Sequence, residues 1–325
     1  MMLLIAFGVA LLLCLLLASR YSPLKSLDVP NERSLHDRPT PHTGGVAIIL
    51  AVFITWVVQA FLYGMPESMV WIAVSALLVA GVSFIDDLHE LSPSVRIMVH
   101  ALAAVVLLVG GLVMFDGWIG ALFSFFAIVW MLNLYNFMDG MDGFAGGMTL
   151  FGFSFLAAAG WLQGVSEYTS FSLLIAAAAV GFLCVNFPPA RIFMGDVGSA
   201  TLGLLAGAFS LWGIQLGLFS WWFPLLVFSP FVVDATVTLV RRLLNRERIW
   251  EAHRSHYYQR LVQLGWGHKK TVLAEYLIML LAGASALAAL QINSPVATGV
   301  VLAGWGCIYL LIATSVHRFE SGLSE

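Results

Sequence analysis

Long stretches without a charged residue recur along this chain of 325 residues, and they limit the folds that it can adopt. A helix that crosses a bilayer needs about 20 predominantly apolar residues, because each residue adds about 1.5 Å along the helix axis. Eleven stretches of about that length are present, and they cover residues 2–19, 43–62, 68–85, 97–115, 118–136, 147–163, 169–187, 198–216, 218–240, 271–291 and 296–316. The pattern predicts an all-α fold, a polytopic membrane helix bundle of about 11 transmembrane helices that forms a single domain over residues 1–325.

The composition agrees with a membrane-embedded chain. Hydrophobic residues make up 60% of the sequence and charged residues only 10%. An average soluble domain has about 25% charged residues. These proportions exclude an ordinary soluble enzyme or soluble binding module.

The basic residues are distributed unevenly between the two sides of the predicted bundle. Eleven spans place the loops 20–42, 86–96, 137–146, 188–197 and 241–270 on the same side as the C-terminal tail, and all 15 Lys and Arg residues fall in these segments. Cytoplasmic loops carry an excess of Lys and Arg. We therefore expect an external N-terminus and a cytoplasmic C-terminus. This bias is ordinary topology and by itself implies no activity, but the same loops also hold groups of acidic and imidazole side chains.

The stretch NLYNFMDGMDGFAGG, residues 133–147, follows a long apolar run and places Asn133, Asn136 and Asp139 three residues apart. Residues three apart lie on the same side of a helix, so these side chains are expected to form one polar stripe. Asp142 continues the spacing, and glycines loosen the end of the helix. The stretch taken alone fits two interpretations equally well: a helix that ends at a functional site, or a capped helix end with solvated aspartates.

The stretch FIDDLHELSP, residues 84–93, places Asp86 and Asp87 directly after a predicted span. Adjacent carboxylates repel each other, and each raises the other's pKa unless a cation or hydrogen-bond donors offset the repulsion. Mg²⁺ is a hard cation that takes carboxylate oxygens and keeps water molecules that phosphate oxygens can replace. The pair therefore indicates either a magnesium site or a solvated acidic turn.

The stretch NFPPARIFMGDVGSATLG, residues 186–203, contains two prolines that end one helix and a GDVGS segment that opens the next. The N-terminus of a helix offers unpaired N–H groups to an anion, and glycine lets the backbone approach that anion closely. Asp196, near the helix start, is then placed to hold a metal that bridges to the anion, and Phe193 offers a face on which a base can stack. An aspartate N-cap is the alternative interpretation of Asp196.

The longest loop, residues 241–270, contains eight basic residues and three histidines. Arg neutralises a diphosphate through paired hydrogen bonds, and His donates to it or exchanges a proton near neutral pH. His253 and His256 are three residues apart, with Arg254 between them, a spacing that can share one helix face. For the four arginines between residues 241 and 248, a polybasic surface that attracts anionic lipid headgroups is the preferred interpretation.

The residues alone do not decide the roles of two further features. The first loop contains NERSLHDRPTPHTGG at residues 31–45, which either lines a substrate entrance or is a rigid connection. Asp234 lies within a predicted span, where a charge at the bilayer centre costs about 2.5 to 3.5 kcal/mol, so a polar partner or water near the headgroups is expected. Function and local structure explain Asp234 equally well.

The DD pair, the NxxNxxDGxDG stretch, the FMGDxGS stretch and the HxxH loop occur in an order that resembles the polyprenyl-phosphate N-acetylhexosamine-1-phosphate transferases, the superfamily of MraY and WecA. The likeness covers nearly the whole chain and looks closest to the WbpL-type enzymes that initiate O-antigen and lipopolysaccharide synthesis or related cell-envelope polysaccharides. It implies transfer of a sugar 1-phosphate from UDP-GlcNAc, UDP-FucNAc or UDP-QuiNAc to undecaprenyl phosphate, with release of UMP. It also implies Mg²⁺, or Mn²⁺ in its place, as cofactor and membrane lipid as a partner. It gives no nucleic-acid partner and allows a homodimer. The location that it implies is the bacterial inner (plasma) membrane, with the N-terminus in the periplasm.

The resemblance also implies roles for individual residues. The catalytic candidates are Asp86, Asp87, His253 and His256, the substrate-binding candidates are Asp139, Asp142, Phe193 and Arg254, and the metal ligands are Asn136 and Asp196. Asp142 and Phe193 match positions that contact uracil, one by a hydrogen bond and one by stacking. Because the reaction brings two phosphate groups together, positioning and shielding by a cation are expected to provide most of the catalysis.

The chain departs from the MraY branch at two motifs. The second aspartate of the pair is followed by Leu88, His89 and Glu90, where that branch has a lysine three residues on, and the histidines are split as HRSH instead of forming a run of three. These differences argue against the muramoyl-pentapeptide substrate and for a simpler N-acetylated sugar. A secondary transporter is the alternative function. Transporter sites usually lie near the bilayer midplane between repeated halves, whereas these acids gather at one membrane face and no internal repeat is found.

Overall fold

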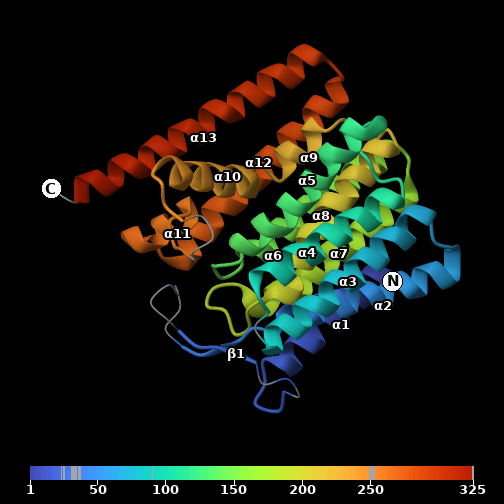
Figure 1. Ribbon diagram of the computed structural model, residues 1–325, viewed down its shortest axis with the longest axis horizontal. Coiled ribbons are helices and arrows are strands. Elements are labelled where there is room, and N and C mark those ends of the chain that lie inside the picture. Colours follow the sequence, from blue (N-terminus) through green and yellow to red (C-terminus); the bar gives the residue numbers. More distant parts are fainter. Residues whose placement is uncertain are drawn as a thin grey trace.

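The computed structural model of the protein describes residues 1–22, 24, 26–30, 35, 38–89, 91–248 and 253–323. Within them the chain is almost entirely helical, with one antiparallel two-stranded sheet (Figure 1). The elements in chain order are α1 (Met2–Leu17), β1 (Leu27–Asp28), β2 (Thr40–Pro41), α2 (Gly44–Tyr63), α3 (Glu67–His89), α4 (Pro93–Val109), α5 (Gly117–Phe137), α6 (Phe144–Leu162), α7 (Ser166–Asn186), α8 (Asp196–Gln215), α9 (Trp222–Val227), α10 (Ser229–Leu244), α11 (Tyr257–Leu261), a π-helical turn η1 (Val262–Trp266), α12 (Gly267–Ile292) and α13 (Pro295–Leu323).

In the described part of the chain, eight helical segments are long and apolar enough to cross a membrane. They are α2, α3, α5, α6, α7, α8, the continuous segment from α11 to α12, and α13, while α1 and α4 are shorter apolar helices. A polytopic membrane helix bundle is therefore confirmed. The number of about 11 crossings and the periplasmic N-terminus stay predictions.

The stretch predicted as one span at residues 218–240 forms two helices, α9 and α10. Phe228 ends α9, and α10 begins at Ser229 with Pro230 in its first turn. In the first turn the missing N–H of proline costs no helical hydrogen bond. Inside one continuous helix, the same proline would remove such a bond and its ring would clash with the preceding turn. The proline therefore divides the apolar run.

The central helix of the bundle is α8, which is buried along nearly its whole length. Small residues allow it to approach its neighbours closely, as is usual between membrane helices. A Cβ on Gly203 would lie 2.5 Å from the carbonyl oxygen of Met131 in α5, and a Cβ on Gly45 in α2 would lie 2.2 Å from the backbone nitrogen of Gly198. The starts of α2 and α8 are thus in backbone contact, which fixes the segment that precedes α8.

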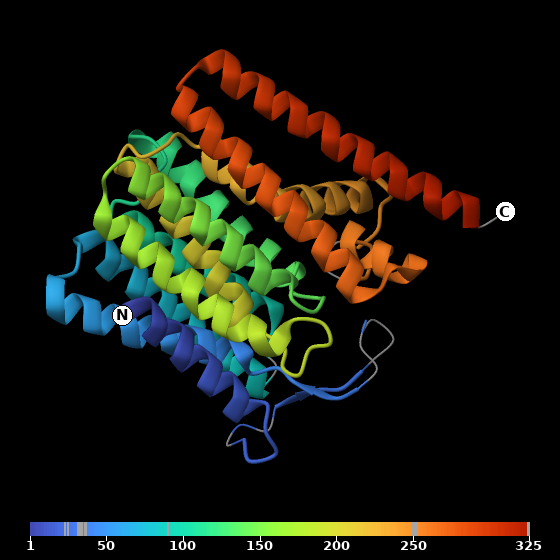
Figure 2. The same ribbon diagram turned by 180° about the vertical axis from the view of Figure 1, so that it is seen from behind.

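The C-terminal helix α13 lies along the outside of the bundle, apart from α1 to α8 (Figures 1 and 2). It packs against α12 and α11, and the hydroxyl of Tyr309 shares a hydrogen bond with Ser229 at the start of α10. Near its C-terminal end, Glu320 accepts two hydrogen bonds from Arg260 of α11. This helix is therefore tied to the short helix that follows the HRSH motif.

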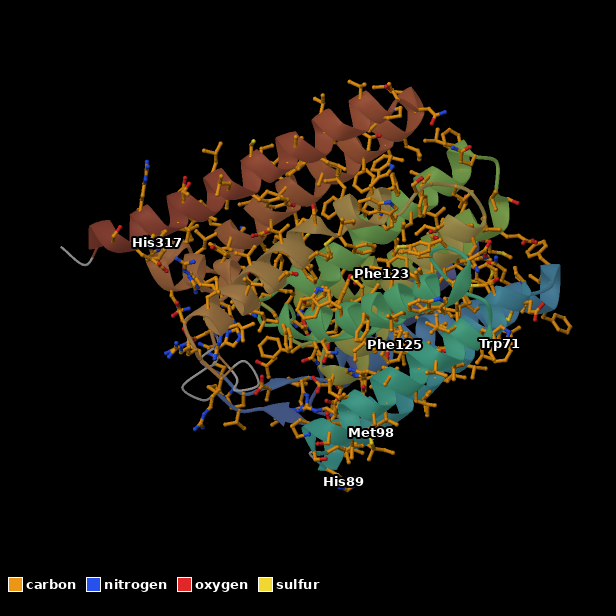
Figure 3. All side chains as sticks on the ribbon, turned by 45° about the horizontal axis from the view of Figure 1, so that its top comes forward. Trp71, His89, Met98, Phe123, Phe125 and His317 are labelled. Carbon is orange, nitrogen blue, oxygen red and sulfur yellow. The ribbon has the colours of Figure 1, made fainter. Side chains whose placement is uncertain are left out.

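The described parts of the predicted cytoplasmic loops meet at one end of the bundle, here called the loop end, where β1 and β2 also lie (Figure 1). Trp71 and His89 mark opposite ends of α3, and His89 is at the loop end (Figure 3). The boundary predicted for this helix is wrong: Asp86 and Asp87 do not follow it but lie in its last turns, because α3 continues to His89. Both carboxylates therefore have directions fixed by a helix.

Candidate active site

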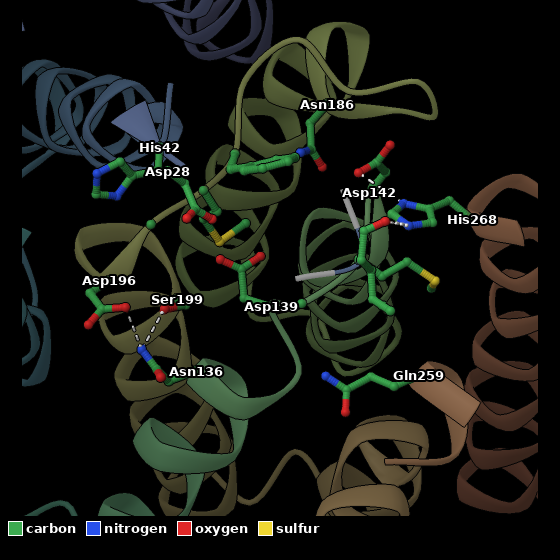
Figure 4. Close-up of a pocket in the computed structure, with 16 residues that line it drawn as sticks. Asp28, His42, Asn136, Asp139, Asp142, Asn186, Asp196, Ser199, Gln259 and His268 are labelled. Carbon is green, nitrogen blue, oxygen red and sulfur yellow. Dashed lines mark hydrogen bonds and ion pairs between the residues drawn. The ribbon is translucent and has the colours of Figure 1, made fainter. Parts of the chain in front are cut away.

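A cavity of about 380 Å³ opens at the loop end, between the N-terminal sheet, the 137–146 loop, the start of α8 and the start of α12 (Figure 4). Its volume falls in the range of small-molecule sites. The residues of its wall that the sequence motifs predict are Asn136, Asp139, Asp142, Phe193 and Asp196. These come from two of the four motifs, which the fold therefore brings to one site.

The segment before α8 is held by the start of α2. The N–H groups of Gly44 and Gly45 donate to the carbonyl oxygens of Phe193 and Met194, with N to O distances of 2.9 and 2.7 Å. Gly195 then has a φ of +75°, a backbone conformation that glycine adopts without strain. The chain turns sharply there, and Gly195 is the N-cap of α8.

Asp87 of α3 occupies the N-terminus of α8. Its Oδ1 accepts the backbone N–H of Asp196 at 3.3 Å, and its Oδ2 accepts that of Val197 at 3.5 Å. Unpaired N–H groups and the helix dipole stabilise a carboxylate at this place. The interpretation of Asp196 as an N-cap is wrong, because Gly195 is the cap and the Asp196 side chain points elsewhere.

Arg96 of α4 links two of the predicted acids, and no sequence motif points to it. Its Nη1 lies 3.4 Å from Oδ2 of Asp86 and 3.3 Å from Oδ2 of Asp196. Asn136 of α5 donates from Nδ2 to Oδ1 of Asp196 at 2.9 Å and to Oγ of Ser199 at 3.1 Å (Figure 4). Side chains from α3, α4, α5 and α8 thus meet at one wall of the cavity, here called the acidic wall. Asn136, Asp196 and Ser199 line the cavity there, whereas Asp86, Asp87 and Arg96 do not.

Asp139 lies half-buried between this acidic wall and the opposite wall that contains Asp142 (Figure 4). Burial raises the pKa of Asp139 well above its usual range, and the negative charges of Asp196 and Asp87 raise it further. A hydrogen bond from the backbone of Gly195 opposes this shift. Burial is thus the main cause of the raised pKa, and the negative charges nearby add to it.

The acidic wall fits a divalent cation. Mg²⁺ keeps several waters and binds through one or two carboxylates, so it needs no cage of protein ligands. In the described chain no group of three His, Cys, Asp or Glu side chains is arranged to hold a metal ion. A cation beside Asp196 would offset the repulsion that raises the pKa of Asp139. Asn136 turns its nitrogen to Asp196, and rotation of this amide would present its oxygen instead.

The opposite wall is built around Asp142. Its Oδ2 accepts the N–H of Ala190 at 2.9 Å, and its Oδ1 lies 3.1 Å from Nδ1 of His268. Asn186 accepts the N–H of Gly143 at 2.8 Å and donates from Nδ2 to a backbone carbonyl in the segment after α7. The 137–146 loop is therefore joined by hydrogen bonds at Asp142 and Gly143 to the end of α7 and to the segment that follows it.

The HRSH motif lies beside the cavity and not in its wall. His256 is buried, and its Nδ1 lies 3.3 Å from Oδ1 of Asp234 in α10. Asp234 also accepts the N–H groups of Tyr257 and Tyr258, at 2.9 and 3.1 Å. This buried carboxylate thus holds the start of α11 and the ring of His256 together. The sequence leaves a functional and a local structural role open for Asp234, and these contacts support the local structural role.

His253 and Arg254 precede this anchor, and Arg254 is exposed. The rings of His253 and His256 are 4.9 Å apart between centroids. Burial lowers the pKa of His253 to about 4, and the positive charges of His256 and Arg242 lower it further. His253 is therefore neutral at pH 7. Of this region, Gln259 reaches the cavity wall, and residues 249–252 lie outside the described part.

Several residues of the cavity wall belong to no motif. They are Asp28, Leu35, His42, Gln259 and His268. Three of them come from the first loop, which therefore lines the cavity and is more than a rigid connection. The proline-rich stretch around His42 is the sequence signal that points to this loop, whereas nothing in the spacing of residues 241–270 distinguishes His268. Residues 31–34 and 36–37 lie outside the described residues.

Comparison with known proteins identifies the relatives of this chain. Residues 69–214, which contain three of the four motifs, match the family described as Glycosyl transferase family 4. The chain is 33% identical over 276 residues to the probable undecaprenyl-phosphate N-acetylglucosaminyl 1-phosphate transferase of Bacillus subtilis, a match that covers 81% of this chain and 76% of the relative. The chain belongs to the MraY and WecA superfamily.

Other members of the MraY and WecA superfamily match over similar lengths. The chain is 28% identical over 326 residues to the decaprenyl-phosphate N-acetylglucosaminephosphotransferase of Mycobacterium leprae, covering 86% of this chain and 81% of the relative. It is 27% identical over 306 residues to the phospho-N-acetylmuramoyl-pentapeptide-transferase of Chloroherpeton thalassium, covering 78% of this chain and 80% of the relative. The superfamily predicted from the four motifs is confirmed, and the closer likeness to WbpL-type enzymes stays a prediction.

Proposed function

We propose that this protein transfers N-acetylhexosamine 1-phosphate from a UDP-sugar to undecaprenyl phosphate. The observation that carries the proposal is the single cavity in which Asn136, Asp139 and Asp196 face Asp142 across the space for one small molecule (Figure 4). The wall with Asn136 and Asp196 suits phosphate groups with their cation, and the wall with Asp142 suits a nucleotide base. Two relatives are named as transferases of undecaprenyl phosphate and decaprenyl phosphate, and these names support the same class of reaction.

The donor binds with its base at the Asp142 wall. The carboxylate of Asp142 accepts the N3–H of uracil, and the ring of Phe193, in the same cavity wall, stacks on the base. The diphosphate then extends toward Asp196, with Arg254 and the neutral His253 beside the cavity as donors. Mg²⁺, or Mn²⁺ in its place, would be held by Asn136 and Asp196 and would shield the phosphate charges.

The transfer is a displacement at phosphorus. A phosphate oxygen of undecaprenyl phosphate attacks the phosphorus that bears the sugar, a new P–O bond forms, and the bond to the bridging oxygen breaks so that UMP leaves with the electron pair. A phosphate monoester has a second pKa of about 6 and is largely dianionic at neutral pH, so the attacking oxygen has no proton to lose. Asp86 and Asp87 therefore act by positioning, through Arg96 and the N-terminus of α8.

The proposal extends to the UDP-sugar that the protein uses and to the membrane in which it works. A simple donor such as UDP-GlcNAc, UDP-FucNAc or UDP-QuiNAc fits a chain whose histidine motif differs from that of the MraY branch. The product, undecaprenyl-diphosphate-sugar, would start O-antigen, lipopolysaccharide or a related cell-envelope polysaccharide. Because nucleotide sugars are made in the cytosol, the loop end would face the cytoplasm from the inner membrane. The protein would work there as a single chain or a homodimer.

The test is release of UMP by the purified full-length protein. Undecaprenyl phosphate and Mg²⁺ are supplied with each UDP-sugar of a panel that contains UDP-GlcNAc, UDP-FucNAc, UDP-QuiNAc and UDP-glucose. We expect UMP from at least one N-acetylated donor and none from UDP-glucose. Absence of UMP with every N-acetylated donor, from protein whose thermal unfolding shows that it is folded, would refute the proposed function.

A further inference from the structure

His268 joins three parts of the chain at the end of the cavity where Asp142 lies. It lies in the first turn of α12 and lines the cavity. Its Nδ1 is 3.1 Å from Oδ1 of Asp142, and its Nε2 is 3.1 Å from the carbonyl oxygen of Leu35 in the first loop. The imidazole thus bridges the 137–146 loop and the first loop, and its contact with Asp142 is drawn in Figure 4.

Two oxygens that only accept hydrogen bonds lie beside the ring nitrogens, since an ionised carboxylate and a backbone carbonyl have no proton to donate. The contact of Nε2 with Leu35 is a hydrogen bond, whereas the contact of Nδ1 with Asp142 is an ion-pair distance. An imidazolium carries an N–H on each nitrogen, so this form donates to Leu35 and forms an ion pair with Asp142.

The loop that carries Asp142 is held by α12 at a second point. Tyr276, two turns after His268, donates from its hydroxyl to the carbonyl oxygen of Gly143 at 2.7 Å. Together with the bond from Ala190 to Oδ2, these contacts fix Asp142 from three directions. Each carboxylate oxygen has a second lone pair, which is available for a ligand in the cavity that Asp142 lines.

We propose that His268 is a positioning residue for the nucleotide base, and that it makes Asp142 a fixed acceptor that selects a base with an imide N–H. This inference rests on the proposed function and extends it to base selectivity. Uracil donates its N3–H to such an acceptor, whereas N3 of cytosine is itself an acceptor and is repelled. The bond from Nε2 to Leu35 also holds the first loop beside the bound nucleotide.

The test is direct binding of UMP and CMP to the full-length protein in detergent, by calorimetry, for wild type and His268→Gln. The glutamine is neutral and presents donors in one direction only, so it cannot serve both oxygens. We expect its Kd for UMP to rise about tenfold and its preference for UMP over CMP to shrink by a similar factor. In the transfer assay, KM for the UDP-sugar should rise while kcat changes by less than about twofold.

The matched control is Lys269→Gln. It removes a positive charge from the same helical turn, but Lys269 is exposed and does not line the cavity. Its Kd for UMP and its preference for UMP should stay within twofold of wild type. An equal loss in Lys269→Gln would overturn the proposal in favour of a general charge effect.

A second variant keeps the proposal testable if His268→Gln does not fold. Asp142→Asn keeps the size of the side chain and removes the fixed acceptor, so the preference for UMP over CMP should shrink as well. Wild-type preference in either folded variant overturns the role of His268, while UMP release by the wild type continues to support the proposed function. A wild type that releases no UMP would refute the proposed function instead.

Discussion

The carboxylate of Asp87, in the last turns of α3, accepts the backbone N–H of Asp196 at the first turn of α8, with 3.3 Å between Oδ1 and N. The two residues are 109 positions apart in the chain, yet one carboxylate serves both as an acceptor for the first N–H groups of a buried helix and as a charge beside the proposed metal ligand. This double role means that the structural and catalytic effects of Asp87 can be separated by substitution.

Asp87→Ala and Asp87→Asn should differ in stability but not in activity. Asp87→Ala removes both acceptors at the start of α8 and should lower the free energy of unfolding by about 0.5 to 2 kcal/mol, seen as a lower Tm. Asparagine keeps one acceptor oxygen and should lower it by less. Both should lose UMP release by about 100-fold, because the negative charge beside Asp196 is gone. Full activity in Asp87→Asn would show that Asp87 only supports the start of α8.

Asp234→Ala should release the segment that contains His256. The substitution leaves His256, Tyr257 and Tyr258 without their shared acceptor, which should cost about 3 kcal/mol of stability. We expect faster hydrogen–deuterium exchange in residues 253–261 and a lower kcat. Thr238→Val is the control, since it removes only the hydroxyl donor that lies 3.1 Å from Asp234. Unchanged exchange in Asp234→Ala would contradict the anchoring role.

His253 should make the protein less stable as the pH falls below neutral. Its pKa is lowered to about 4 in the folded protein, while an unfolded histidine has a pKa of about 6.5. The unfolded state therefore binds the proton more readily, so the stabilising contribution is complete above pH 6.5 and is lost as the pH falls toward 4. The Tm of wild type should drop over this range by more than the Tm of His253→Gln. Parallel curves for the two proteins would rule this contribution out.

Gly45→Ala should disturb the site from a distance. The new Cβ would lie 2.2 Å from the backbone nitrogen of Gly198, so the starts of α2 and α8 have to separate. We expect a loss of about 1 to 3 kcal/mol in stability together with reduced UMP release. Gly81→Ala is the matched control, because a Cβ at that helical position meets nothing within 4 Å. Similar Tm values for the two variants would argue against the close contact.

The sequence predicts the helices and most of the acidic wall because both leave local patterns. Apolar runs give the spans, and motifs such as GDVGS mark the ends of helices where Asp196 and Asn136 meet. The contacts of Arg96 and His268 leave no such pattern, since Arg96 meets Asp196 across 100 residues and single basic residues in loops are also what topology requires. The break at Phe228 needed the position of Pro230, which a count of apolar residues ignores.

The central claim, that this cavity transfers a sugar phosphate with a cation held at Asp196, is tested most directly by UMP release from Asp196→Asn across a Mg²⁺ titration. The amide keeps the shape of the side chain and removes the charge that would hold the cation. We predict a rate at least about 100-fold below wild type that rises at higher Mg²⁺ concentration, while the Tm stays close to that of wild type. Turnover at the wild-type rate at every Mg²⁺ concentration would contradict the assignment.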